Sequence, residues 1–215
     1  MKKNIARVKR LLSRYGIGAG KRLQLDDYLQ GEHDLRQLHL GCGNIHIPGW
    51  CNVDVIKTGA TDLVLDIRAL PGIPGDVVER IYSCHVLEHF SHDEIAEILA
   101  NWFQVLKPGG EIRLSVPDLD AITRIYQSNL DHFNVPGNQP WIALIYGGQK
   151  DQYDYHKTGF NFCWLKYLLE AAGFTDVQRY PNEPHFIPGV IDNSIAMPFG
   201  EFLSLNITAR KGAQK

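Results

Sequence analysis

No apolar run in these 215 residues approaches the roughly 20 positions that a helix needs to cross a bilayer. The apolar stretch of a secretory signal is also missing near the N-terminus, because charges interrupt it at Arg7, Lys9, Arg10 and Arg14. The chain has no CxxC pair and lacks the closely spaced cysteines of a disulfide framework. Its cysteines are Cys42, Cys51, Cys84 and Cys163. These absences predict a cytoplasmic protein with reduced thiols.

Acidic residues are missing from the first 22 positions, which hold eight lysines and arginines. The net charge of the whole chain is −2, so the remainder carries 14 basic against 24 acidic residues and should repel nucleic acid. Apolar residues recur at helical spacing at Ile5, Val8, Leu12 and Tyr15, which predicts a basic helical extension over residues 1–30. Weak contact with a membrane surface is one interpretation, and we favour a helix packed on the body with a solvated basic face.

Short apolar runs alternate with helical patterns along the rest of the chain, and no linker or repeat divides it. Helices are predicted over residues 91–106, where Ser91 and Glu94 fit a capping box, and over 165–172, which Gly173 ends. Strands are predicted over residues 37–40, 51–55, 63–67, 80–84, 111–116, 175–180 and 203–210. This order predicts one α/β domain over residues 31–215, with a mainly parallel sheet between helices.

A glycine turn and two acidic residues follow the first three predicted strands. Gly41 and Gly43 come directly after the first strand, Asp54 ends the second and Asp66 ends the third. In open α/β sheets, ligands bind beyond the carboxyl ends of the strands. Glycine lets backbone amides approach a ligand, a carboxylate at Asp54 can accept both hydroxyl hydrogens of a ribose, and Asp66 can accept from an adenine amino group.

The same segment argues against a dinucleotide. His46 stands where the third glycine of GxGxxG is required, so a nicotinamide-dependent oxidoreductase is disfavoured. Asn52 follows Gly43 by only nine positions, which leaves little room for a crossover helix and its phosphate-binding N-terminus. A nucleoside ligand without phosphates fits this spacing better.

Several segments together resemble a known family. They are residues 38–44 (LHLGCGN), 49–54 (GWCNVD), 65–67 (LDI), 85–90 (HVLEHF), 106–110 (LKPGG), 156–160 (HKTGF) and 168–174 (LLEAAGF). In this set the chain is similar to class I S-adenosylmethionine (SAM)-dependent methyltransferases, particularly the bacterial group described as methyltransferase type 11-like. The sequence departs from that pattern at His39, which replaces the usual acidic residue of the first strand, and in the short first crossover.

The resemblance implies a Rossmann-like α/β fold, with a seven-stranded, mostly parallel sheet whose last strand is antiparallel. It implies SAM as methyl donor and S-adenosylhomocysteine as product. The cofactor-binding positions are then Leu40, Gly41, Cys42, Gly43, Asp54, Val55, Asp66, Ile67, Cys84 and His85.

Methyl transfer needs an acceptor lone pair in line with the sulfonium, and a general base helps when the acceptor is a hydroxyl. The polar candidates are His85, Glu88, His89, Asp118, Tyr153, Tyr155, His156 and His185. We assign catalytic roles to His89 and His156, since an imidazole pKa near 6.5 suits a base. Asp118, Tyr153 and Tyr155 are assigned to the substrate. For each histidine, a helix cap or a surface hydrogen bond remains an equally simple interpretation.

Residues 85–89 (HVLEH) also match the HxxEH pattern of inverted zinc proteases. That mechanism needs both histidines on one face of a helix, and the motif here follows a strand directly. We expect no metal, but a divalent ion bound by Glu88, His89 and His156 stays open as an alternative. This arrangement is similar to the ExxEH metal site of small-RNA 2′-O-methyltransferases, with His85 in place of the first glutamate.

The segment around residues 118–160 is predicted to form a substrate pocket or lid. Aromatic walls or core packing explain its rings equally well, at Trp141, Tyr146, Tyr153, Tyr155 and Phe160. Carbohydrates commonly stack on such rings, and the family resembled is associated with surface-glycan assembly, so a sugar hydroxyl or another small molecule is the expected acceptor. A non-catalytic partner or scaffold module with the same fold is the second hypothesis. The sequence leaves the oligomeric state open.

Overall fold

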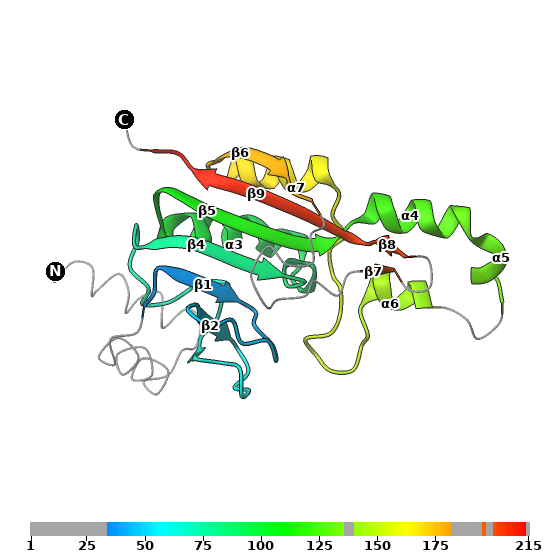
Figure 1. The fold of residues 1–215 in the computed structure, drawn as a ribbon, viewed down its shortest axis with the longest axis horizontal. Coiled ribbons are helices and arrows are strands. Elements are labelled where there is room, and N and C mark those ends of the chain that lie inside the picture. Colours follow the sequence, from blue (N-terminus) through cyan, green and yellow to red (C-terminus); the bar gives the residue numbers. More distant parts are fainter. Residues whose placement is uncertain (1–33, 136–139, 182–194, 197–199, 214–215) are drawn as a thin grey trace.

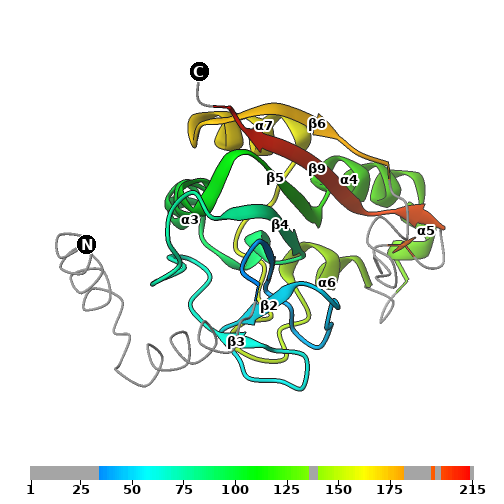
Figure 2. The ribbon, with the colours of Figure 1, turned by 60° about the vertical axis from the view of Figure 1, so that its left-hand side comes forward.

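A computed structural model describes residues 34–135, 140–181, 195–196 and 200–213. A seven-stranded sheet of order β3-β2-β1-β4-β5-β9-β6 forms its centre (Figures 1 and 2). The strands are β1 (Gln37–Leu40), β2 (Cys51–Asp54), β3 (Leu63–Val64), β4 (Val78–Cys84), β5 (Leu106–Pro117), β6 (Phe174–Arg179) and β9 (Ser204–Lys211). Only β9 runs against its neighbours, and its arrowhead opposes those of β4 and β5 in Figure 1. The expected seven-stranded sheet with an antiparallel last strand is confirmed.

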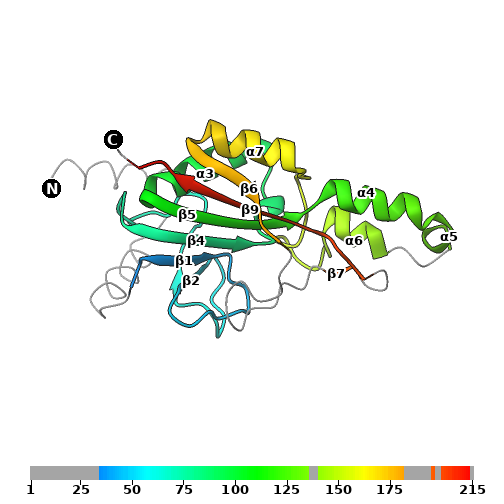
Figure 3. The same cartoon turned by 45° about the horizontal axis from the view of Figure 1, so that its top comes forward.

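The connections from β1 to β2 and from β2 to β3 hold no helix. Each is too short for the dozen or more residues that a helical crossover needs. Among the described residues, the two helices packed on the sheet lie on the same face, α3 (His92–Val105) and α7 (Phe162–Ala171) (Figure 3). The expectation of helices on both faces is therefore not met in the part of the chain that the structure describes.

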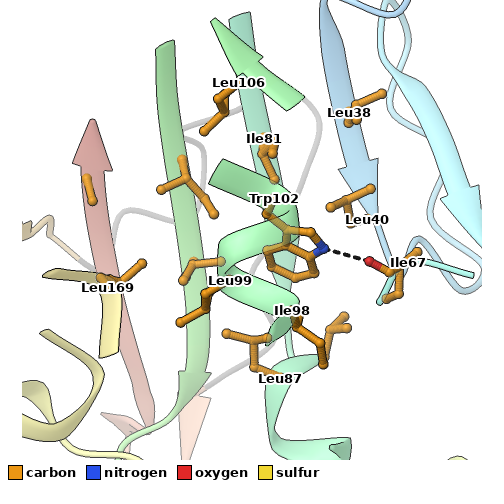
Figure 4. Packing of buried hydrophobic residues seen from close by; sticks show 14 of the residues in the cluster. Leu38, Leu40, Ile67, Ile81, Leu87, Ile98, Leu99, Trp102, Leu106 and Leu169 are labelled. Atoms are coloured by element: carbon orange, nitrogen blue, oxygen red, sulfur yellow. Dashed lines mark hydrogen bonds between the residues drawn. The ribbon is translucent and has the colours of Figure 1, made fainter. Parts of the chain in front are cut away.

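The main core lies between that face of the sheet and α3 and α7. Ile98, Leu99 and Trp102 from α3 meet Leu38, Leu40 and Ile81 from the sheet, all 0–1% exposed (Figure 4). Side chains three and four positions apart share one face of a helix, which is why α3 buries this apolar stripe. The capping box predicted for Ser91 and Glu94 is present at its start.

Three short helices extend beyond the carboxyl end of β5 (Figure 1). They are α4 (Leu119–Ser128), α5 (Leu130–Phe133) and α6 (Pro140–Tyr146), and the two-stranded pair of β7 (Ile195–Ala196) and β8 (Glu201–Phe202) follows later in the chain. Ile122, Ile125, Phe133 and Leu203 form a separate small core there. The region therefore has packing of its own, and its role as a lid stays a prediction.

Three predicted boundaries were wrong by three or more residues, and one of them is the start of α7, at Phe162 instead of residue 165. β3 ends at Val64 instead of residue 67, because Asp66 begins a turn in which its carbonyl accepts from Leu70 N at 3.0 Å. β5 begins at Leu106 instead of 111, because Val78 pairs with Leu106 and Arg80 with Glu111, so that residues 107–110 form an irregularity within the strand. The predicted extension over 1–30 lies outside the described residues. No helix among the described residues is both long and apolar enough to cross a membrane.

Candidate functional site

The predicted site residues meet at one edge of the sheet. The strand order reverses between β1 and β4, and their carboxyl ends lead into Gly41 and His85. A reversal of this kind opens a crevice, because the connections of the two strands leave in opposite directions. A cavity of about 660 Å³ lies at this point, within the range of small-molecule sites.

The glycine turn is fixed by backbone bonds to β2. Gly41 N and Cys42 N both donate to the carbonyl of Val53, at 2.8 and 3.2 Å. Gly41 has φ +73°, and a Cβ built there would lie 2.3 Å from Cγ2 of Val86. The turn thus excludes a side chain at Gly41 for two reasons, the left-handed backbone and the neighbouring valine.

Asp54 organises the next step of the turn. Its Oδ2 accepts from Gly43 N at 2.8 Å, and its Oδ1 accepts from Ile56 N at 2.9 Å. Each oxygen of a carboxylate accepts two hydrogen bonds, so one lone pair of each stays available. The carboxylate therefore holds the loop and can still receive two hydroxyl hydrogens from the cavity.

Asp66 is held by a neighbouring cation. Arg68 makes a bidentate pair with it, at 3.0 Å from Nε to Oδ1 and 2.8 Å from Nη2 to Oδ2, and this pair raises the pKa of Arg68. Helix α3 holds the same turn, since Trp102 Nε1 donates to the carbonyl of Ile67 at 2.6 Å (Figure 4). The pair and this bond set the place of Asp66 in the cavity wall.

Most of the predicted cofactor residues line this cavity. Those that do are Gly41, Gly43, Asp54, Val55, Asp66, Ile67 and His85. Leu40, Cys42 and Cys84 do not. Leu40 is fully buried in the core. Burial raises the pKa of the Cys42 thiol to about 11, and its sulfur lies 3.8 Å from Oγ1 of Thr61.

Further residues line the cavity that the sequence analysis did not assign to the cofactor or the acceptor. They are Asn44, Ile56, Thr58, Arg68, Val86, Phe90, Glu94, Gln152 and Lys157. Val86 and Phe90 flank Glu88 and His89 in the HVLEHF segment, so their neighbourhood was readable. Gln152 and Lys157 come from a distant loop that no periodicity places at this edge.

That loop, residues 147–160, is hydrogen-bonded to the short helix η1 (Leu87–His89). The carbonyl of Glu88 accepts from Lys157 N at 2.7 Å and from Thr158 N at 3.2 Å. His89 Nδ1 lies 3.2 Å from the carbonyl of Tyr155, which can only accept, so Nδ1 carries the hydrogen. These bonds bring the two predicted catalytic histidines together, with ring centroids of His89 and His156 5.1 Å apart.

The two imidazoles face different cavities. His89 lines the 660 Å³ cavity, whereas His156 lines a second one of about 250 Å³ with Leu144, Tyr146 and Lys157. Burial lowers the pKa of His156, and the nearby Glu88 opposes that shift while His89 adds to it. His156 is therefore neutral at pH 7, as a base or a ligand must be.

His85 does not share a helix with His89. It has φ +53° and precedes η1, with Nε2 2.7 Å from Oγ of Ser204 and Nδ1 3.2 Å from Oε1 of Glu88. The inverted zinc protease arrangement needs both histidines on one helix, so the structure contradicts it.

Of the residues assigned to the substrate, Tyr153 lines the large cavity and Asp118 does not. Tyr153 lines the large cavity and is 47% exposed, and Tyr155 and Tyr146 are also exposed. Asp118 lines neither cavity described here, because its carboxylate caps α4 through Asp120 N and pairs with Arg179 at 3.2 Å. Phe160 is a core residue at 1% exposure. His185 and the Trp141 side chain lie outside what the structure describes.

Comparison with known proteins agrees with this architecture. A family model described as a methyltransferase domain matches residues 49–114. A comparison of the sequence with curated proteins finds no significant match.

Two solved structures illustrate the likeness in fold. The 1,6-didemethyltoxoflavin-N1-methyltransferase of Burkholderia thailandensis, solved with its substrate and S-adenosylhomocysteine, has 17% identity and a TM-score of 0.52, over 98% of this chain and 86% of that one. A SAM-dependent methyltransferase from Archaeoglobus fulgidus has 16% identity and a TM-score of 0.52, over 94% and 99% of the two chains. The resemblance inferred from the sequence is confirmed, and the chain has the Rossmann-like fold of class I methyltransferases.

Proposed function

We propose that this chain, which has the class I methyltransferase fold, transfers a methyl group from SAM to a hydroxyl of a small acceptor. The main support for this function is the cavity at the point where the strand order reverses. Asp54, which ends β2, and Asp66, which follows β3, both lie on its wall.

The residues of the cavity fit the adenosine part of SAM. Space is open above Gly43, where a Cβ would meet nothing within 4 Å. The spare lone pairs of Asp54 suit the two ribose hydroxyls, because a diol needs two adjacent acceptors. Val55 and Ile56 are 37% and 43% exposed beside the cavity, and Ile67 also lines it, which gives the adenine ring apolar surfaces to contact.

When bound, SAM supplies an electrophilic methyl group on a sulfonium, and the C–S electron pair goes to sulfur as the acceptor bond forms. The chain must hold the acceptor in line and remove its proton. Gln152, Tyr153 and Lys157 line the cavity from the loop and are placed to orient the acceptor. His89 and His156 are placed to promote loss of its proton.

The chemistry of this side of the cavity supports a hydroxyl acceptor. A hydroxyl must lose its proton during transfer, and the buried carboxylate of Glu88 beside the imidazoles of His89 and His156 can assist that loss. Exposed tyrosine rings at positions 153 and 155 suit stacking against a sugar. A cytoplasmic bacterial enzyme of surface-polysaccharide assembly is the setting we propose. The described cysteines form no disulfide, which fits a reducing compartment.

Calorimetric titration with S-adenosylhomocysteine tests the cofactor assignment. Charge-assisted hydrogen bonds contribute about 1.5–3 kcal/mol, so Asp54→Ala should weaken binding roughly 10- to 150-fold. Asp93→Ala is the matched control, because the Asp93 side chain is 87% exposed and lies outside the cavity. Absence of binding, or equal affinity in both variants, refutes the assignment.

A panel of sugars incubated with methyl-labelled SAM tests the acceptor. Label in an ether-linked methyl group is the expected result. Transfer to amines only would contradict the hydroxyl proposal, and cofactor binding without any transfer would favour the non-catalytic module.

A further inference from the structure

Three donor side chains converge beside the cofactor cavity from two distant segments. Glu88 and His89 come from η1, and His156 comes from the loop fastened over it. One donor atom of each lies within 4.8 Å of the others. Donors that share an ion at about 2.0–2.2 Å are at most about 4.4 Å apart, so small side-chain rotations bring all three onto one ion.

The carboxylate of Glu88 lacks the partners that burial demands. It is 1% exposed, and neither oxygen has a hydrogen-bond partner among the described residues. His85 Nδ1 lies 3.2 Å from Oε1, but this contact misses hydrogen-bond geometry and is an ion pair only when His85 is protonated. Burial of a carboxylate lowers the stability of the fold by several kcal/mol unless an opposite charge or a metal ion compensates it. In the described part of the chain, the buried carboxylate thus lies among the imidazoles of His85, His89 and His156, and no lysine or arginine pairs with it.

The imidazole of His89 is oriented by a backbone carbonyl. His89 holds the carbonyl of Tyr155 through Nδ1, which leaves the lone pair of the neutral ring on Nε2. His156 lies beside Leu144 in the smaller cavity, where its backbone N donates to the carbonyl of Tyr146 at 3.1 Å. Histidines that bind metals characteristically donate their other N–H to a carbonyl or carboxylate in this way.

We propose that Glu88, His89 and His156 bind a divalent transition-metal ion. Two imidazoles with one carboxylate form the ligand set that binds zinc in hydrolytic enzymes and iron in oxygenases, with positions left open for an exogenous ligand. Hard ions such as Mg²⁺ prefer oxygen ligands, so the two imidazoles favour Zn²⁺, Co²⁺ or Fe²⁺.

The position of the ion indicates how it would take part in the reaction. This role of the ion rests on the methyl-transfer function proposed above. His89 lines the large cavity and His156 the smaller one, so the ion would stand between them. The ion would lower the pKa of an acceptor hydroxyl beside it, so that the proton would leave to solvent. An oxygen lone pair would then form the bond to the methyl carbon while the C–S bond breaks with its electron pair on sulfur. The histidines would then act as ligands, and the ion would replace an imidazole base.

Metal titration of the full-length, untagged chain tests the site. The protein is stripped with a chelator, and Zn²⁺, Mn²⁺ and Co²⁺ are titrated by calorimetry, with the visible absorption of Co²⁺ reporting imidazole ligands. Glu88→Gln and His156→Gln remove a ligand, and His92→Gln is the control, since His92 is 74% exposed at the start of α3. Circular dichroism and S-adenosylhomocysteine titration of each variant establish that it is folded.

We expect one ion per chain. Loss of an outer-shell partner weakens metal binding about 10- to 100-fold, so loss of either ligand should weaken it by at least that factor, with His92→Gln unchanged. Equal affinity in wild type, Glu88→Gln and His156→Gln would overturn the site, and so would absence of binding by the folded wild type. Because the metal titration uses no SAM, ion binding without nucleoside binding would keep this site and refute only the methyl-transfer function.

Discussion

Alanine substitutions at the two glycines of the turn, Gly41 and Gly43, can be compared directly. Both should destabilise the left-handed backbone, and only the substitution at Gly41 should also clash with a neighbouring side chain. Gly41 and Gly43 both have left-handed backbones, with φ of +73° and +53°. A Cβ on Gly41 would lie 2.3 Å from Cγ2 and 3.1 Å from Cγ1 of Val86, whereas a Cβ on Gly43 meets nothing within 4 Å. Alanine at the two positions therefore separates the conformational cost from the steric one.

The magnitudes follow from these two costs. A left-handed backbone costs an alanine about 1–2 kcal/mol, which is the whole effect expected for Gly43→Ala. Forcing extra atoms into a packed site adds about 1–3 kcal/mol. Gly41→Ala should therefore lower the free energy of unfolding by roughly 2–5 kcal/mol.

Urea unfolding followed by circular dichroism measures both variants, and Val86→Ala completes a double-mutant cycle. Val86 is 8% exposed, so its truncation alone costs about 1.5–3 kcal/mol. Removal of Cγ1 and Cγ2 also removes the two closest contacts of the added Cβ, and leaves Cβ of residue 86 at 3.3 Å. In the Val86→Ala background, Gly41→Ala should then cost no more than the backbone component of about 1–2 kcal/mol.

Two results would refute this reasoning. Equal destabilisation by Gly41→Ala and Gly43→Ala would mean that Val86 does not restrict the turn. Strict additivity of Gly41→Ala and Val86→Ala would mean that the two residues do not meet as the structure shows.

Two further predictions concern buried polar side chains. Trp102→Phe removes the donor to the buried carbonyl of Ile67 and should lower the free energy of unfolding in urea by about 1–3 kcal/mol. It should also weaken S-adenosylhomocysteine binding, because the turn that holds Asp66 loosens. Unchanged values in both assays would contradict the positioning role of Trp102. Burial lowers the pKa of His39, which contacts Oδ1 of Asn52 at 2.9 Å, so the unfolded chain takes up a proton below pH 6.5 before the folded one does. The free energy of unfolding should stay level above pH 6.5 and fall as the pH drops through the folded pKa, with a shallower fall in His39→Gln; an identical pH profile for the two proteins would disprove the assignment.

The local features of the chain were predictable from sequence, because they depend on short-range spacing. Alternation of apolar runs placed β1, β2 and β4, and the Ser91–Glu94 capping box placed the start of α3. The carboxyl ends of parallel strands share an edge, so residues that end successive strands had to meet there. Gly41, Asp54 and Asp66 could therefore be assigned to one site before any contact was known.

Only the tertiary structure decided which partner each side chain has. Asp118 and Asp66 look alike in sequence, each beside the end of a strand, yet Asp118 is occupied as a helix cap while Asp66 lines the cavity. The neighbourhood of Glu88, His89 and His156, the contact between Gly41 and Val86, and the bond from Trp102 to Ile67 all join segments far apart in the chain. Periodicity carries no information about such pairs, because they form where loops close and helices dock, and burial then determines which charges are left without partners.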